Sequence, residues 1–204
     1  DCPTPAPQLQ TATFTICASD EVPTFIAVNS EGPVTWHESG AIVATDDTFT
    51  PTDKKGLDGT YTWSVSQFAN ECESVPATAT LIIHKNPTIT VQNTKVDFCD
   101  YDATVAINAT ANTAGTNWTM TGEAVTAGTS NFEPTKATTV NAPITITINF
   151  VDNNNCASTE TLDFTVHQVH PLAVSSPITQ LESDYETVLS VTPDGTKKVN
   201  WYDA

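Results

Sequence analysis

Four of the five cysteines in this chain follow a repeated spacing. In each of two stretches, an early cysteine is followed 19 residues later by a tryptophan and 55 to 57 residues later by a second cysteine. Because these cysteines come singly and not in the close pairs typical of zinc sites, we expect disulfide bonds. Disulfides at repeated spacing indicate an oxidising compartment. The residues are Cys17, Trp36 and Cys72 in the first stretch and Cys99, Trp118 and Cys156 in the second.

The same spacing divides the chain into repeated units. We expect domains at residues 1–86 and 87–169, and the N-terminal part of a third at 170–204. In the third unit Trp201 keeps the spacing, but Glu182 stands where the cysteine would be. Cys2 lies outside the pattern, and either it pairs with a cysteine upstream or it is free. Both boundaries are short polar steps ending in proline, which favours an extended backbone and an end-to-end arrangement.

Alternating apolar and polar residues predict an all-β fold. The chain is rich in threonine and valine, which suit strands better than helices. Period-two runs at 60–66, 144–148 and 164–166 indicate strands with one face in water. We find no segment of helical length with apolar residues at helical spacing.

Short strands at this spacing, about seven in each unit, predict immunoglobulin-like β-sandwiches. In that fold a disulfide joins the two sheets beside a buried tryptophan. We therefore expect two bridges, Cys17–Cys72 and Cys99–Cys156. Trp36, Trp118 and Trp201 are the expected core tryptophans.

The charge of the chain excludes some classes of partner. Seven Lys and Arg residues against 24 acidic residues give a net charge of −17. Nucleic-acid binding requires a basic surface, so we expect no nucleic-acid partner. The same field opposes anionic membrane surfaces, and we expect no direct membrane insertion. Solubility or cation binding are both possible reasons for the acidity.

Carboxylates and histidines provide candidates for metal binding or catalysis. Asp97, Asp100 and Asp102 surround Cys99 and are calcium candidates, although their spacing does not match an EF-hand loop. His84 and His167 occupy nearly the same place in successive units, which favours a structural role. No catalytic motif for a nucleophile, metal or phosphate is present. We therefore expect a non-enzyme with no cofactor.

Two aromatic residues are candidates for ligand binding. Tyr61 and Trp63 lie two residues apart, so they share one face of the predicted strand. Exposed on that face, they would form a stacking platform for a glycan. Packed inward, they would be part of the core.

Several phrases resemble a known group of repeats. These are residues 59–67, the Asn-Glu-Cys-Glu-Ser phrase at 70–74, and residues 199–204. Together they resemble the immunoglobulin-like repeats of very large secreted proteins of the Bacteroidota, many of which end in a gliding-motility-associated sorting domain. The resemblance implies a type 9 secreted protein at the outer-membrane cell surface. It carries no catalytic residues.

The leading hypothesis is a stalk of structural or interaction repeats in a bacterial surface adhesin or gliding-motility protein. Its partners would be neighbouring repeats of the same polypeptide, surface glycans, or the outer-membrane secretion and motility machinery. The alternative is a carbohydrate-binding or spacer region of a secreted polysaccharide-degrading enzyme. An exposed aromatic platform would favour that alternative.

Overall fold

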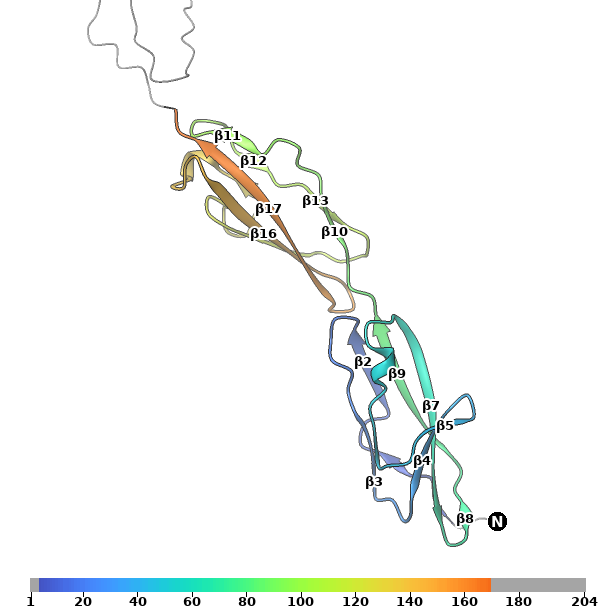
Figure 1. The fold of residues 1–204 in the computed structure, drawn as a ribbon. Coiled ribbons are helices and arrows are strands. Elements are labelled where there is room, and N and C mark those ends of the chain that lie inside the picture. The colour runs from blue at the N-terminus through green and yellow to red at the C-terminus, as the bar shows by residue number, and fades with distance from the viewer. Residues whose placement is uncertain (1–3, 170–204) are drawn as a thin grey trace, which may run out of the picture.

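The computed structural model describes residues 4–169 and consists of two β-rich lobes. They follow one another along one axis, with the N-terminus at one end and the exit of the described chain at the other (Figure 1). The all-β prediction is confirmed, since the only helices among the described residues are two short 3-10 turns. Cys2, Glu182 and Trp201 lie outside the described residues.

The first lobe contains nine strands and one 3-10 turn. In chain order they are β1 (Gln8–Leu9), β2 (Thr13–Cys17), β3 (Phe25–Val28), β4 (Val34–Glu38), β5 (Ala41–Ala44), β6 (Thr48–Phe49), η1 (Thr52–Lys54), β7 (Gly59–Ala69), β8 (Cys72–Glu73) and β9 (Ala77–His84). One sheet has the order β1-β3-β6, and the other has the order β2-β9-β7-β4-β5. β2 pairs with β9 in parallel, and the other pairs are antiparallel.

The second lobe repeats this plan with fewer paired residues. Its elements are β10 (Ile89–Val91), β11 (Asp97–Cys99), β12 (Val105–Ala106), β13 (Ala109–Ala111), β14 (Asn117–Thr121), β15 (Asn131–Phe132), η2 (Pro134–Lys136), β16 (Pro143–Val151) and β17 (Ala157–His167). The main sheet has the order β11-β17-β16-β14, with β11 parallel to β17. Two ladders, β10-β13 and β12-β15, form the opposite side.

The strand order is that of an immunoglobulin-like sandwich. In that fold the last, penultimate and third strands are neighbours in one sheet. Here β9-β7-β4 and β17-β16-β14 have this order. In the first lobe, β1, β3 and β6 form the second sheet, as the first, second and fifth strands of that fold do.

Alternation along the strands creates the two cores. On β9, Ala79, Leu81 and Ile83 are buried, and their neighbours are more exposed. β16 alternates in the same way, because successive side chains of a strand point to opposite faces. Each lobe consequently has its own hydrophobic cluster.

Aromatic rings fill the first core, in the region where the sequence predicts a cystine. Phe25 on β3 and Trp63 on β7 have ring centroids 5.8 Å apart, and Phe25 lies 6.1 Å from Trp36. Trp36 is fully buried, and its Nε1–H donates to the Asp46 carbonyl at 2.8 Å. The tryptophan therefore packs against other rings and not against a disulfide.

Trp118 differs from Trp36, and its assignment as a simple core residue needs correction. Its ring contacts Phe150 at 4.5 Å between centroids, but the side chain is only half-buried. In the first lobe β5 covers the outer edge of β4. Among the described residues no strand pairs with the corresponding edge of β14, which leaves one side of Trp118 open.

Replacing Leu81 by alanine tests the first core. Leu81 has no exposed surface, so Leu81→Ala should lower the free energy of unfolding by about 2–5 kcal/mol through lost burial and a new cavity. Leu57 is 53% exposed, and Leu57→Ala should change stability by less than about 0.5 kcal/mol. Urea denaturation of both variants measures the difference. Equal effects would contradict this assignment of the core.

Candidate functional site: the disulfide-bridged junction

The two lobes meet where β9 leads into β10. Cys17, at the end of β2, is paired in register with His84, the last residue of β9. Cys156 lies in the turn between β16 and β17, immediately before Ala157. The far end of the first lobe and the near end of the second thus each present one cysteine at the junction.

These two cysteines form a disulfide between the lobes. The Cys17 and Cys156 Cα atoms lie 5.5 Å apart, and 139 residues separate them in sequence. Cys156 is fully buried and Cys17 is 8% exposed. The lobes are therefore joined twice, once by the peptide chain and once by the disulfide.

The predicted pairing of Cys17 with Cys72 is wrong, for a geometric reason. Cys72 lies just before the start of β9, whereas Cys17 lies beside its end. Eight residues of strand at about 3.3 Å each place these positions roughly 25 Å apart. Disulfides require Cα atoms within about 7 Å.

The predicted Cys99–Cys156 bridge fails for the same reason. Cys99 pairs in register with His167, the last residue of β17, and Cys156 precedes the first residue of that strand. Cys99 is a free, half-buried thiol within the part of the chain that the structure describes. Cys72 is disulfide-bonded. Cys2 lies outside the described residues.

Asn86 adds a polar clasp to the junction. Its side-chain amide donates to Ser19 Oγ at 3.0 Å and to the carbonyl of Ala157 at 2.9 Å. Its Oδ1 accepts the Ser19 backbone N–H at 2.9 Å. One side chain in the linker is thus bonded to both lobes.

Asp152 shapes the turn that presents Cys156. Asp152 is 3% exposed, and its carboxylate accepts hydrogen bonds from the N–H groups of Asn154 at 2.9 Å and of Cys156 at 2.8 Å. Asn155 adopts a positive φ of 64°, which asparagine tolerates better than most residues. The run of three asparagines after Asp152 is therefore a turn sequence that holds the cysteine in place.

The turn after Cys17 has a sequence signal that the predictions above do not include. The Cys17 N–H donates to Asp20 Oδ2 at 2.8 Å, and the Asp20 N–H donates back to the Cys17 carbonyl at 2.9 Å. A Cys-x-x-Asp pattern encodes this turn, and it recurs at Cys99 and Asp102. It marks each early cysteine as the end of a strand at one pole of its lobe.

The calcium candidates are engaged in separate contacts. Asp102 accepts hydrogen bonds from Lys95 Nζ at 2.8 Å and from the Cys99 N–H, and in that order these lower the pKa of its carboxyl. Asp97 lies 3.3 Å from the His167 ring, and Asp100 accepts the N–H of Val169. Among the described residues no three acidic, histidine or cysteine side chains form a metal-binding group.

Tyr61 and Trp63 do not form an exposed platform. Trp63 is 1% exposed and belongs to the first core. The half-buried Tyr61 ring stacks on Trp63 at 6.4 Å, and the Lys54 ammonium lies 5.4 Å from the Tyr61 centroid. Glycan stacking on this pair is therefore not supported.

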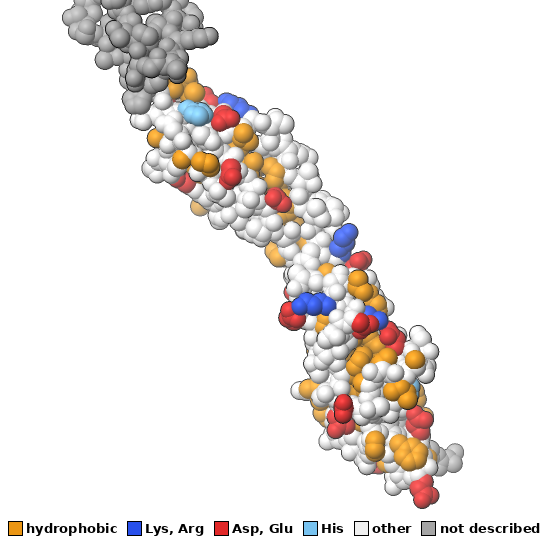
Figure 2. Space-filling view, in the orientation of Figure 1, with side chains coloured by type: hydrophobic (Ala, Val, Ile, Leu, Met, Phe, Trp, Pro, Cys, Tyr) orange, Lys and Arg blue, Asp and Glu red, His pale blue; other side chains and the backbone are white. Residues whose placement is uncertain are grey.

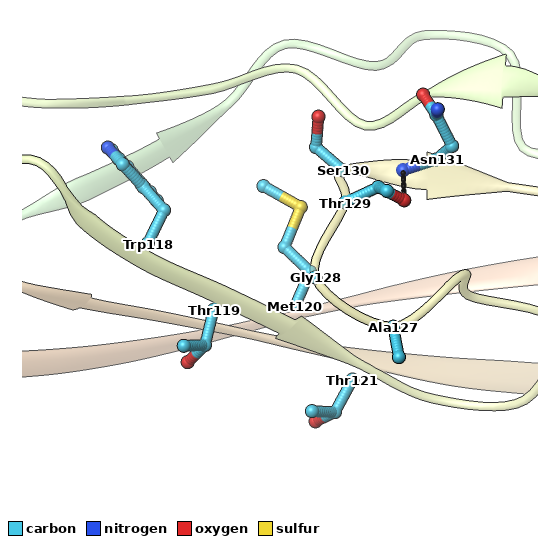
Figure 3. Close-up of a pocket in the computed structure, with 9 residues that line it drawn as sticks. All are labelled: Trp118, Thr119, Met120, Thr121, Ala127, Gly128, Thr129, Ser130 and Asn131. Atoms are coloured by element: carbon cyan, nitrogen blue, oxygen red, sulfur yellow. Dashed lines mark hydrogen bonds between the residues drawn. The ribbon is translucent and has the colours of Figure 1, made fainter.

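A groove lies instead beside Trp118 in the second lobe. Its volume is about 560 Å³. Trp118 and Met120 point from β14 toward the loop at 127–131, whereas Thr119 and Thr121 point away from it (Figure 3). The groove is not predicted from the sequence, because the spacing pattern places Trp118 in the core.

Two carboxylates hold the chain that forms the loop wall of this groove. Glu123 accepts hydrogen bonds from the N–H groups of Thr138 and Thr139. Hydrogen bonding to the side chain and then the backbone of Thr139, followed by that to Thr138, lowers the pKa of Glu123 to about 2. Glu133 accepts hydrogen bonds from Thr126 Oγ1 and Lys136 Nζ, which lower its pKa. Ionised carboxylates thus anchor the segment on both sides of the loop.

On the face drawn in Figure 2, acidic side chains are dispersed over both lobes between uncharged side chains and backbone. Within residues 4–169 no helix is long and apolar enough to span a membrane.

No protein-family model and no curated protein sequence matches the chain. Solved structures of modular proteins are similar to it at low identity. The fibronectin(III)-like modules of Clostridium thermocellum CbhA have 14% identity and a TM-score of 0.38, covering 79% of this chain and 94% of that one.

Two structures from insects give similar values. Extracellular domains 3–5 of Drosophila OTK have 13% identity and a TM-score of 0.40, covering 78% of this chain and 62% of that one. The insect immune protein hemolin has 13% identity and a TM-score of 0.39, covering 81% and 47%. This chain spans less than two thirds of either. With TM-scores below 0.5, these similarities assign no family, and the fold assignment depends on the strand order.

Removing the inter-lobe disulfide should destabilise the chain and separate the unfolding of its lobes. A bridge across 139 residues contributes on the order of 5 kcal/mol in the chain-entropy account. We expect the Cys17→Ser/Cys156→Ser double variant to show a lower Tm and two resolved transitions in calorimetry. Cys99→Ser removes a thiol without a bond and is the matched control. Identical transitions in both variants would contradict a stabilising role for the bridge.

Acid should release the anchor at Glu123. Because its folded pKa of about 2 lies below the ordinary 4.5, its contribution is present above pH 4.5 and is lost as the pH falls toward 2. An NMR titration should give a midpoint of about 2 for this carboxyl, with the amide shifts of Thr138 and Thr139 following it. In Glu123→Gln this pH dependence should vanish. A midpoint near 4.5 in the parent chain would refute the anchor.

Proposed function

We propose that this chain is a non-catalytic stalk segment built of tandem immunoglobulin-like domains in a secreted or surface-exposed bacterial protein. The observation that carries the proposal is the disulfide between Cys17 and Cys156. A bond between two successive domains acts on their relative position, which matters for a molecule whose task is reach and stiffness. A disulfide also fits an extracellular compartment.

The junction supports a stiff connection on physical grounds. A single peptide linker leaves neighbouring domains free to bend and rotate. Here the disulfide and the Asn86 clasp add contacts beside the linker. Bending at this point would require these contacts to break or the lobes themselves to deform.

The bridge also sets the path of a mechanical load. Tension from the N-terminus would pass along the chain to Cys17, cross the disulfide to Cys156, and leave through β17. The residues between the two cysteines lie within a covalent loop and would carry no end-to-end extension. Most of both lobes is therefore protected from unfolding to full length.

An adhesin or gliding-motility role on the outer membrane is the specific form of this proposal, in line with the resemblance of residues 59–67 and 70–74. Surface glycans and the secretion or motility machinery are its proposed partners. The alternative, a region of a secreted polysaccharide-degrading enzyme, shares the spacer role. The carbohydrate-binding form of this alternative depends on Tyr61 and Trp63 as an exposed aromatic pair. It is not supported, because Trp63 is buried.

Single-molecule stretching tests the proposed load path. Pulled by its ends, the oxidised chain should not release the residues between Cys17 and Cys156. With reductant, an additional contour length of roughly 500 Å should appear, from 139 residues at about 3.6 Å each. The Cys99→Ser chain should behave as the parent in both conditions. Full-length release from the oxidised chain would refute the load path and the stalk function built on it.

A further inference from the structure

Cys99 occupies the same place in the second lobe as Cys17 does in the first. Each is the last residue of a strand that pairs in parallel with the final strand of its lobe. Cys17 lies opposite His84, and Cys99 lies opposite His167. Both thiols are therefore carried to the pole from which the chain leaves the lobe.

The backbone around the two cysteines is bonded in the same way. The Cys99 N–H donates to Asp102 Oδ2 at 3.2 Å, and the Asp102 N–H donates to the Cys99 carbonyl at 3.0 Å, as Asp20 and Cys17 do in the first lobe. The N–H of the next residue, Asp100, donates to the His167 backbone carbonyl at 3.0 Å. In the first lobe, the Ala18 N–H donates to the His84 backbone carbonyl at 2.8 Å in the same way.

Among residues 4–169, no further lobe covers the surroundings of Cys99. At the first junction Ser19 and Asn86, two residues after Cys17 and His84, bond to each other, and Asn86 reaches the second lobe. The corresponding residues at the second pole are Tyr101 and Val169, which are 67% and 43% exposed. Two large apolar side chains thus lie near a half-buried thiol, at the positions that Ser19 and Asn86 hold in the first junction, where Asn86 contacts the second lobe.

We propose that Cys99 is one half of a second inter-domain disulfide, formed with a cysteine of a following immunoglobulin-like domain in the same polypeptide. The partner cysteine would stand where Cys156 stands, in the turn before the final strand of that domain. Tyr101 and Val169 would be covered by the same turn. The inference rests on the proposed function, because it requires a further domain in the stalk.

The bond would form by thiol–disulfide exchange. The thiolate of one cysteine attacks a disulfide supplied by an oxidoreductase of the oxidising compartment, and a mixed disulfide results. The second cysteine then attacks the mixed disulfide, so that the new S–S bond forms as the donor leaves as a dithiol. The two cysteines lose two electrons to the donor disulfide, and their two protons end on its thiols or in solvent.

Disulfide mapping of the full-length polypeptide tests this proposal. The protein is isolated without reductant, its free thiols are alkylated, and its peptides are analysed by mass spectrometry. We expect the Cys99 peptide to be linked to a cysteine peptide from the following domain, at a separation close to the 139 residues of the first bridge. An alkylated Cys99, or a bond between the Cys99 residues of two copies, would overturn the inference.

Cys99→Ser in the same full chain provides a second readout. It should expose one new alkylatable thiol, on the late cysteine of the following domain, and leave the Cys17–Cys156 bridge intact. Tyr101→Ser is the matched control and should expose none. If Cys99→Ser exposes no new thiol, the inference fails and the stalk function stands. If the native polypeptide lacks the Cys17–Cys156 bridge itself, the proposed function fails.

Discussion

The length of the final strand in each lobe is the constraint on which the arrangement of the cysteines depends. β9 and β17 run from one pole of a lobe to the other, and a late cysteine precedes each strand while an early one lies beside its end. Cysteines at opposite poles cannot bond within one sandwich. Cys17 and Cys156 instead lie where the exit pole of the first lobe meets the entry pole of the second, and their bridge joins the two lobes.

This placement changes what stabilises each sandwich. An immunoglobulin domain with a cross-sheet cystine gains stability from the bridge and from the tryptophan beside it. In the first lobe Phe25, Trp36, Phe49 and Trp63 pack in that region with centroids 5.4 to 6.1 Å apart. Ring packing and burial hold the two sheets of this lobe together without a cross-sheet disulfide. The disulfide of Cys17 joins the two lobes instead.

The junction itself combines contacts of different strength. The disulfide fixes the distance between two poles, and Asn86 fixes their rotation through hydrogen bonds to Ser19 and Ala157. Asp20 and Asp152 hold the two cysteine-bearing turns through backbone N–H groups. The polar residues near the cysteines thus act on orientation, and the covalent bond acts on separation.

Sequence periodicity by itself determined the β-class and the buried face of strands such as β16, because alternation is a local property of the chain. The order of the cysteines and the tryptophan along the chain also identified Trp36 as a core residue. Only the tertiary structure decided the cysteine pairing and the exposure of Trp118. The spacing of 55 to 57 residues between cysteines is the same whether the bond closes within a unit or across two units. Which pair meets depends on which pole each strand end reaches, and that distance in space is not encoded in the spacing along the chain.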